Sequence, residues 1–169
     1  MELIREVPDF PEPGISFKDI TPLLSDVEAL SEVVDLMARP FRDASVATVL
    51  GIEARGFVLG APVALELKCG FVPVRKEGKL PSATVKETYE LEYGTNTVEI
   101  HIDAIRDGDR VLIVDDVLAT GGTMLATCNL TRRLGGAIVG LSFLGELQFL
   151  NGRDKLKEHR IQSVLQFGK

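Results

Sequence analysis

The sequence has few of the residues and segments that mark several specialised classes of protein. It contains two cysteines in 169 residues, Cys69 and Cys128, and their spacing matches no zinc site, so we expect both to be reduced residues of the core. No apolar stretch approaches the length of a membrane span, and the opening segment MELIREVPDF lacks a signal-peptide pattern. These absences predict a cytoplasmic protein without a membrane partner.

Positive charge is also in short supply. Lysine and arginine number 19 against 25 aspartates and glutamates, which gives a net charge of -6. A nucleic-acid partner would require a basic face, so we expect none. The chain also lacks the G-x-x-x-x-G-K-[ST] motif of nucleoside triphosphate sites and the G-x-G-x-x-G motif of dinucleotide sites.

What the sequence does contain is the composition of one ordinary globular domain. It is 45% apolar and 26% charged, and it is long enough to bury a hydrophobic core without disulfides or metals. It shows no internal repeat, low-complexity segment or linker. We therefore expect a single domain over residues 1–169.

Short apolar runs alternate with helical periodicity, which predicts an α/β fold. The capping-box pattern Ser25–Glu28 precedes a helix over residues 26–41. A later helix is predicted to turn Val58, Ala61 and Leu65 inward. In chain order, the predicted elements after the first helix are a strand over 47–50, a helix over 57–67, strands over 71–74 and 111–114, a helix over 124–134 and a strand over 137–143. Repeated β-α-β order predicts a parallel sheet flanked by helices on both sides.

A different hydrophobic pattern lies between the two β-α-β repeats. Residues 89–93 and 98–102 alternate apolar with polar side chains, and Gly94-Thr95-Asn96 separates them, which predicts a β-hairpin. Its polar, glycine-containing tip is expected to be mobile until a ligand binds. Residues 161–167 alternate weakly and are predicted to form a last strand at the edge of the sheet.

The most informative segment is VLIVDDVLATGGTM, Val111 to Met124. Its apolar start reads as a strand buried on both faces, so Asp115 and Asp116 are expected at the carboxyl edge of the sheet, where ligands bind. After two more apolar residues, five residues offer backbone N–H groups and hydroxyls at a helix start, a favourable place for an anion. They are Ala119, Thr120, Gly121, Gly122 and Thr123. Neighbouring acids beside an anion site fit a sugar phosphate, whose hydroxyls donate to the carboxylates.

Simpler interpretations of the same residues remain open at this point. Acid pairs at strand ends also serve as solvated turn residues, and Gly121-Gly122 can be only a tight connection. Two glycines flanked by Thr120 and Thr123 exceed what an ordinary turn needs, which favours the phosphate site.

The segment Val111–Met124 resembles the phosphoribosyl pyrophosphate signature of the type I phosphoribosyltransferase family. Further segments resemble the adenine-specific branch of that family, and together they cover nearly the whole chain. They are DFPEPGISFKDITPLL (Asp9 to Leu24), GIEARGF (Gly51 to Phe57), VRKEGKLP (Val74 to Pro81) and YELEYG (Tyr89 to Gly94). The resemblance implies the family's fold, with a flexible β-hairpin and a small N-terminal hood segment.

It also implies a purine salvage enzyme that converts adenine and 5-phosphoribosyl 1-diphosphate (PRPP) to AMP and pyrophosphate. The implied cofactor is Mg²⁺, held mainly by substrate oxygens and water with no direct protein ligand. The implied assembly is a homodimer. Two other functions remain open: transfer to hypoxanthine, guanine or xanthine, and a regulator that binds PRPP without turnover.

The resemblance assigns residues to each part of the substrates. Glu53, Ala54 and Arg55 lie in the family's pyrophosphate loop, whose Glu53–Ala54 bond is implied to be cis, and Arg55 counts as catalytic. Lys76 and Lys79, beside Arg75, follow the next strand and can converge on the same polyanion. From the residues alone, these charges can equally be a solvated loop.

The remaining assignments concern the base. Glu92 near the hairpin tip is the implied catalytic acid/base residue. Ser16, Phe17 and Lys18 form the implied base-recognition segment, with Phe17 stacked on the purine. Many relatives have arginine where this chain has Lys18, and lysine lacks the planar fork of arginine, so selection for adenine by a two-bond contact is in doubt here. The two histidines, His101 and His159, show no nucleophile or metal spacing and are expected to be structural or surface residues.

Overall fold

The structure is a computed structural model that describes residues 3–90 and 94–168. The chain divides into two compact units, Met1–Val34 and Asp35–Lys169. Each unit has its own sheet, and the second contains most of the secondary structure.

The first unit is built on a short antiparallel ladder. Strand β1 (Arg5–Val7) pairs with β2 (Phe17–Asp19), and helix α1 (Thr21–Ser25) follows. The ring of Phe10 packs edge-on against Phe17 with centroids 5.2 Å apart. The predicted hood segment is therefore an ordered hairpin with its own aromatic contact.

Helix α2 (Val27–Ala38) confirms the first predicted helix, with two corrections at its ends. Its N-cap is Asp26, whose carboxylate accepts the N–H groups of Glu28 and Ala29 at 3.1 and 2.9 Å. Ser25, the first residue of the predicted capping box, instead donates its hydroxyl to the Pro22 carbonyl. The helix stops at Ala38 rather than residue 41, because Pro40 lies in the following 3-10 turn η1 (Arg39–Ala44) and cannot donate an α-helical hydrogen bond.

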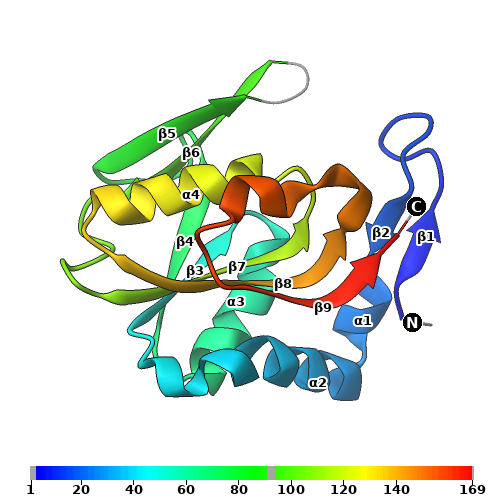
Figure 1. The fold of residues 1–169 in the computed structure, drawn as a ribbon, viewed down its shortest axis with the longest axis horizontal. Coiled ribbons are helices and arrows are strands. Elements are labelled where there is room, and N and C mark those ends of the chain that lie inside the picture. The colour runs from blue at the N-terminus through cyan, green and yellow to red at the C-terminus, as the bar shows by residue number, and fades with distance from the viewer. Residues whose placement is uncertain (1–2, 91–93, 169) are drawn as a thin grey trace. The chain divides into compact units, whose positions relative to one another are not determined.

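A seven-stranded sheet forms the centre of the second unit (Figure 1). Its spatial order is β5-β6-β4-β3-β7-β8-β9. The strands are β3 (Thr48–Ile52), β4 (Gly70–Lys76), β5 (Thr84–Glu90), β6 (Thr95–His101), β7 (Arg110–Leu118), β8 (Ala137–Leu147) and β9 (Ile161–Phe167). The strands β4, β3, β7, β8 and β9 run parallel, which confirms the predicted α/β class.

The predicted hairpin is confirmed, but its strands lie elsewhere than the sequence pattern suggested. Strands β5 and β6 pair antiparallel from Thr84↔His101 to Glu90↔Thr95, so they begin earlier than residue 89 and end earlier than residue 102. The hairpin also joins the main sheet, because β6 pairs antiparallel with the end of β4. Strand β9 lies at the opposite edge, as predicted.

Helices α3 (Arg55–Glu66) and α4 (Gly122–Arg133) lie on opposite faces of the sheet (Figure 1). The predicted inward face of α3 is wrong: Val58 and Leu65 are 45% and 79% exposed, whereas Leu59 and Val63 are fully buried. The cause is Gly60, where a Cβ atom would lie 3.0 Å from the Phe71 ring and 3.4 Å from the backbone of β3. A close approach of helix and strand at this glycine turns the Leu59 and Val63 side inward.

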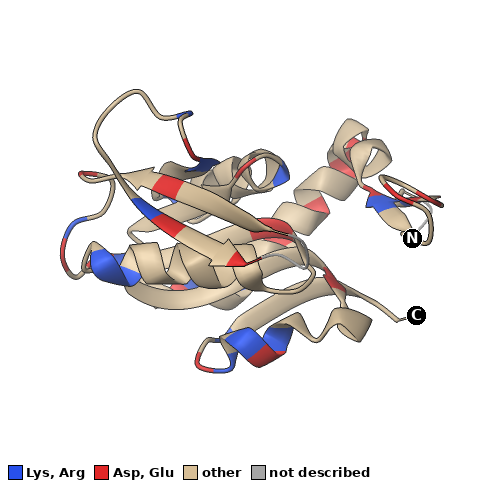
Figure 2. Cartoon of the chain, turned by 90° about the horizontal axis from the view of Figure 1, so that it is seen from above, with Lys and Arg blue, Asp and Glu red and all other residues tan. Residues whose placement is uncertain are grey.

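On the α4 side, the core combines alternating residues of the parallel strands with one face of the helix. It includes Leu50, Val111, Ile113, Cys128 and Leu130, each fully buried. Burial raises the pKa of the Cys128 thiol to about 12, and both cysteines are free, as predicted, although Cys69 is only half-buried. In the view of Figure 2, lysines and arginines stand among acids rather than in one basic stripe. Among the described residues, no helix combines the length and apolar character needed to cross a membrane.

Candidate active site

The carboxyl ends of β3, β4 and β7 bring several of the predicted site residues to one edge of the sheet. Parallel strands end at a common edge, so the segments that follow β3 and β4 meet there. The sequence predicted that strand β7 ends at Val114, but it continues to Leu118 beside β8. Its pairing with β3 does stop at Val114. Asp115 and Asp116 therefore lie beyond the last pair between β7 and β3, although β7 still pairs with β8 there. The end of the pairing with β3 leaves room for a ligand.

The two acids differ in their surroundings. Asp116 is 6% exposed, and the Arg55 Nε lies 2.8 Å from its Oδ2. That oxygen is buried and, among the described residues, finds no hydrogen-bond donor of good geometry, so its contact with Arg55 is an ion pair. The backbone N–H of Asp116 donates to Asp115 Oδ1 at 2.9 Å. Burial and the adjacent Asp116 carboxylate raise the pKa of Asp115 well above its usual value.

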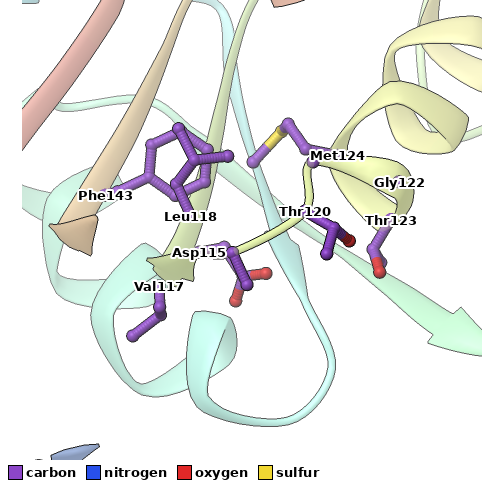
Figure 3. A pocket seen from close by; sticks show the side chains of 10 residues that line it. Asp115, Val117, Leu118, Thr120, Gly122, Thr123, Met124 and Phe143 are labelled. Atoms are coloured by element: carbon purple, nitrogen blue, oxygen red, sulfur yellow. The ribbon is translucent and has the colours of Figure 1, made fainter. Parts of the chain in front are cut away.

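The predicted phosphate turn, residues 119–123, leads directly into α4. Gly121 is the N-cap with φ of 77°, a left-handed conformation that favours glycine, and α4 begins at Gly122. The turn lines a small cavity of about 70 Å³ together with Asp115, Val117 and Phe143. The side chains of Asp115, Thr120 and Thr123 stand along this loop (Figure 3). Unpaired N–H groups at the start of a helix beside a small cavity suit one phosphate group.

The cations at the end of β4 and just after it gather around Glu53; β4 extends to Lys76 rather than residue 74, so Arg75 and Lys76 are its last residues and only Lys79 follows it. Lys79 forms an ion pair with Glu53, the Arg75 Nε lies 3.3 Å from the Glu53 Oε2, and the N–H of Lys76 donates to that oxygen at 3.0 Å. Burial raises the pKa of Glu53, but the bonds from Lys79 and the Lys76 backbone outweigh burial and lower it. The bond between Glu53 and Ala54 is cis, as the resemblance implied. The structure therefore brings Arg75 and Lys79 together at Glu53, with Lys76 taking part through its backbone, whereas Arg55 pairs with Asp116. Their shared role toward pyrophosphate stays a prediction.

Comparison with known proteins bears directly on this arrangement. The model of the phosphoribosyl transferase domain matches residues 21–159. Adenine phosphoribosyltransferase of Myxococcus xanthus is 57% identical over 164 residues, which is 97% of this chain and 89% of that protein. The crystal structure of adenine phosphoribosyltransferase from Rhodothermus marinus matches with a TM-score of 0.95 and 55% identity, and covers 98% of this chain and 95% of that one.

The chain belongs to the adenine phosphoribosyltransferase family. A more distant member, from Saccharomyces cerevisiae, was crystallised with adenine and an imino-altritol bisphosphate. It matches with a TM-score of 0.90 and 38% identity over 95% of this chain and 93% of that one.

For some of the residues predicted in an adenine phosphoribosyltransferase site, the role toward the substrates stays a prediction. Ser16, Phe17 and Lys18 belong to the first unit, where Lys18 forms an ion pair with Glu6 in the β1–β2 ladder. Glu92 lies outside the described residues. Their roles toward the base still come from the resemblance.

The sequence interpretation missed Glu99 on β6. This side chain is 2% exposed and accepts the backbone N–H groups of Lys79 and Leu80, each at 3.0 Å. It thereby fixes the loop that carries Lys79. Its place between Val98 and Ile100 gave no signal of burial, because hairpin alternation alone puts such an acid on a solvated face.

The sequence interpretation also missed Tyr89. Its hydroxyl accepts a hydrogen bond from the Thr123 hydroxyl at 2.9 Å, so β5 is tied to the phosphate turn. Alternation had marked Tyr89 only as an apolar position of the hairpin.

We predict that Asp115→Asn makes the ligand-free protein more stable near neutral pH. A carboxyl with a raised pKa in the folded state binds its proton more tightly there than in the unfolded chain, so it destabilises the fold once the pH exceeds both values. Denaturation at several pH values should show an advantage of the variant that shrinks as the pH falls toward 3.8, the ordinary value of the group. Asp103→Asn, which removes an exposed acid, is the control. An equal gain in both variants would contradict the assignment.

Proposed function

We propose that this chain transfers the 5-phosphoribosyl group of PRPP to adenine, giving AMP and pyrophosphate. One observation carries the proposal: an acid pair whose second member, Asp116, is buried, the arginine beside it and a glycine-rich turn at a helix start all lie at the same edge of the sheet. The relatives named adenine phosphoribosyltransferase, at 57% and 55% identity, support adenine as the base.

The acid pair and the turn divide the ribose phosphate between them. Asp115 and Asp116 accept hydrogen bonds from the two neighbouring ribose hydroxyls, while the backbone N–H groups of residues 119–123 and the hydroxyls of Thr120 and Thr123 hold the 5'-phosphate. The buried Asp116 Oδ2, which accepts no hydrogen bond of good geometry, suits a hydroxyl donor. The ribose is thus held at both ends before the reaction.

The cations serve the leaving group. Charge grows on the pyrophosphate as its bond to the sugar breaks, so Arg55, Lys76 and Lys79 stabilise the transition state more than the bound substrate. In the free protein Arg55 and Lys79 are paired with Asp116 and Glu53, and the ligand competes for those pairings. Catalysis therefore depends mainly on charge placement.

Magnesium fits this site as a partner of the substrate. Among the described residues, no three acid, histidine or cysteine side chains form a metal cage. The acid pair nevertheless places hard oxygen atoms beside the phosphate turn, which suits an ion that keeps its waters and binds substrate oxygens. When bound, Mg²⁺ would neutralise part of the pyrophosphate charge.

The base side of the reaction rests on the resemblance and on relatives. Phe17 would stack on adenine, with Ser16 and Lys18 at its edge, and Glu92 would take the proton of the attacking ring nitrogen. The S. cerevisiae enzyme was crystallised with adenine. Whether Lys18 discriminates as strictly as the arginine of other members is decided by competition between bases.

We expect AMP and pyrophosphate to form when the protein, Mg²⁺, PRPP and adenine are combined, and no AMP to form when EDTA removes the metal. Hypoxanthine, guanine and xanthine, each supplied in competition with adenine, should yield far less nucleotide. Chromatography of the products measures all four bases at once. Preferred use of another purine would replace adenine as the substrate, and binding of PRPP without any nucleotide product would instead indicate a regulator.

We expect Asp116→Asn and Arg55→Ala each to lower turnover by about a hundredfold or more, because each removes a charge positioned for the transition state. The fold should persist in both, as judged by circular dichroism. Arg39→Ala is the matched control, because it removes an arginine of the 3-10 turn η1 that pairs with Asp35 of α2. Near-wild-type turnover in either site variant would remove that residue from the mechanism.

We further propose a homodimer, as the resemblance implies. The exposed apolar side chains of Val58 and Leu65 on α3 are consistent with a face covered by a second copy. Sedimentation velocity should give a dimer for the wild type, and Leu65→Glu should shift the protein toward monomer. A monomeric wild type would refute this assembly.

The proposed location is the cytoplasm, where Cys69 and Cys128 would stay reduced. Cell fractionation tests this location.

A further inference from the structure

The phosphate turn rests on a second glycine from a distant part of the chain. Gly152 is buried and is the first residue of the 3-10 turn η3 (Gly152–Leu156). A Cβ atom on Gly121 would lie 2.6 Å from the Gly152 carbonyl oxygen. A Cβ atom on Gly152 would overlap the carbonyl oxygen of Ala119 and lie 3.0 Å from Leu118. The backbones of the turn and of η3 therefore touch, with no side chain between them.

Gly152 is itself held firmly. Its neighbour Arg153 donates two hydrogen bonds, each 2.7 Å long, to the carboxylate of Glu146. Glu146 is 5% exposed and also accepts the hydroxyl of Ser163 at 2.9 Å. At the other end of η3, Leu156 is 1% exposed and belongs to the core. A two-bond arginine–carboxylate pair fixes geometry as well as charge.

The ion pair is anchored beside the turn. Glu146 on β8 is the register partner of Leu118, the last residue of β7 before the turn begins. The hydrogen bonds from Arg153 and Ser163 outweigh burial and lower the pKa of Glu146, so this carboxylate is ionised where it meets the arginine. Glu146 on β8 therefore holds Arg153, and the adjacent Gly152 contacts the backbone of Ala119 and Gly121.

We propose that Gly152 is a positioning residue for the 5'-phosphate turn and that the Glu146–Arg153 pair holds it in place. The inference rests on the proposed function, because it assumes that residues 119–123 bind the 5'-phosphate. Neither Gly152 nor Arg153 lines the cavity of the turn. They act by setting where the amides of the turn stand, and displacement of about 1 Å at such a group can cost a hundredfold in rate.

The test is Gly152→Ala, with binding measured separately at the two ends of the substrate. By isothermal titration calorimetry, the dissociation constants of AMP and ribose 5-phosphate should rise about ten- to hundredfold, in proportion to a displaced turn. The constant for pyrophosphate with Mg²⁺ should change less than about twofold, since its cations lie on other loops. An unchanged AMP affinity, or an equal loss for pyrophosphate, would overturn the proposal.

Two further variants separate this role from general destabilisation. Gly140→Ala is the matched control, because its Cβ atom would overlap the Phe41 ring, away from the phosphate turn; it should lower stability and leave both affinities unchanged. Arg153→Lys keeps the charge but loses the two-bond geometry, so it should weaken AMP binding in the same direction and stands in if Gly152→Ala fails to fold. No weakening in Arg153→Lys would remove the ion pair from the proposal.

Thr120→Glu tests the assumption on which this proposal rests, namely that residues 119–123 bind the 5'-phosphate. A carboxylate placed on the turn should repel the phosphate and abolish AMP binding. If Thr120→Glu weakens AMP binding and Gly152→Ala does not, only the positioning role fails. Should AMP affinity survive in Thr120→Glu, the phosphate assignment fails, and the inference fails with it.

Discussion

The crowding of two carboxylates on adjacent residues of β7 is the constraint on which the rest of the site depends. Asp116 is nearly buried, and Asp115 has a raised pKa because burial and its neighbour both oppose its charge. One arginine, Arg55, lies against the pair. The arrangement is unfavourable in the ligand-free protein, and the proposed hydrogen bonds from ribose hydroxyls would relieve it. A site of this kind trades stability for a ready-made shape.

The parallel sheet makes this arrangement possible. Strands β3 and β7 part after the Gly51↔Val114 pair, so α3 begins beside the acids and its first residue, Arg55, reaches them. Gly56 is required at this approach, because a Cβ atom there would lie 2.9 Å from the Val114 carbonyl oxygen. Helix α4 starts on the other side of the same strand. Two helix starts and two acids thus share one edge, which follows from the parallel direction of the strands.

Much of this edge could be predicted from the sequence, and what could not be has a physical reason. The apolar run before Asp115, the Gly121-Gly122 turn and the order of elements are local patterns, so the fold class and the glycine turn at the start of α4 were predictable, whereas its role toward phosphate stays a prediction. The phase of α3 was not, because Gly60 and Phe71 set it through a contact between distant segments. Glu99 and Gly152 escaped notice for the same reason: a buried acid and a touching glycine carry no signal in their immediate neighbours. Lys18 and Glu92 keep roles that only resemblance supplies.

The pairing of Lys79 and Arg75 with Glu53 has a consequence for how an anionic ligand arrives. The single carboxylate of Glu53 offsets the charge of one of these two cations, and the chain as a whole carries a charge of -6. A distant polyanion therefore meets little net attraction, and electrostatic steering, which raises association rates and makes them sensitive to salt, has little to act on. Encounter should proceed at an ordinary diffusive pace with weak dependence on ionic strength. Discrimination among anions then depends on short-range contacts, in which the bound anion replaces Glu53 as the partner of Lys79 and Arg75.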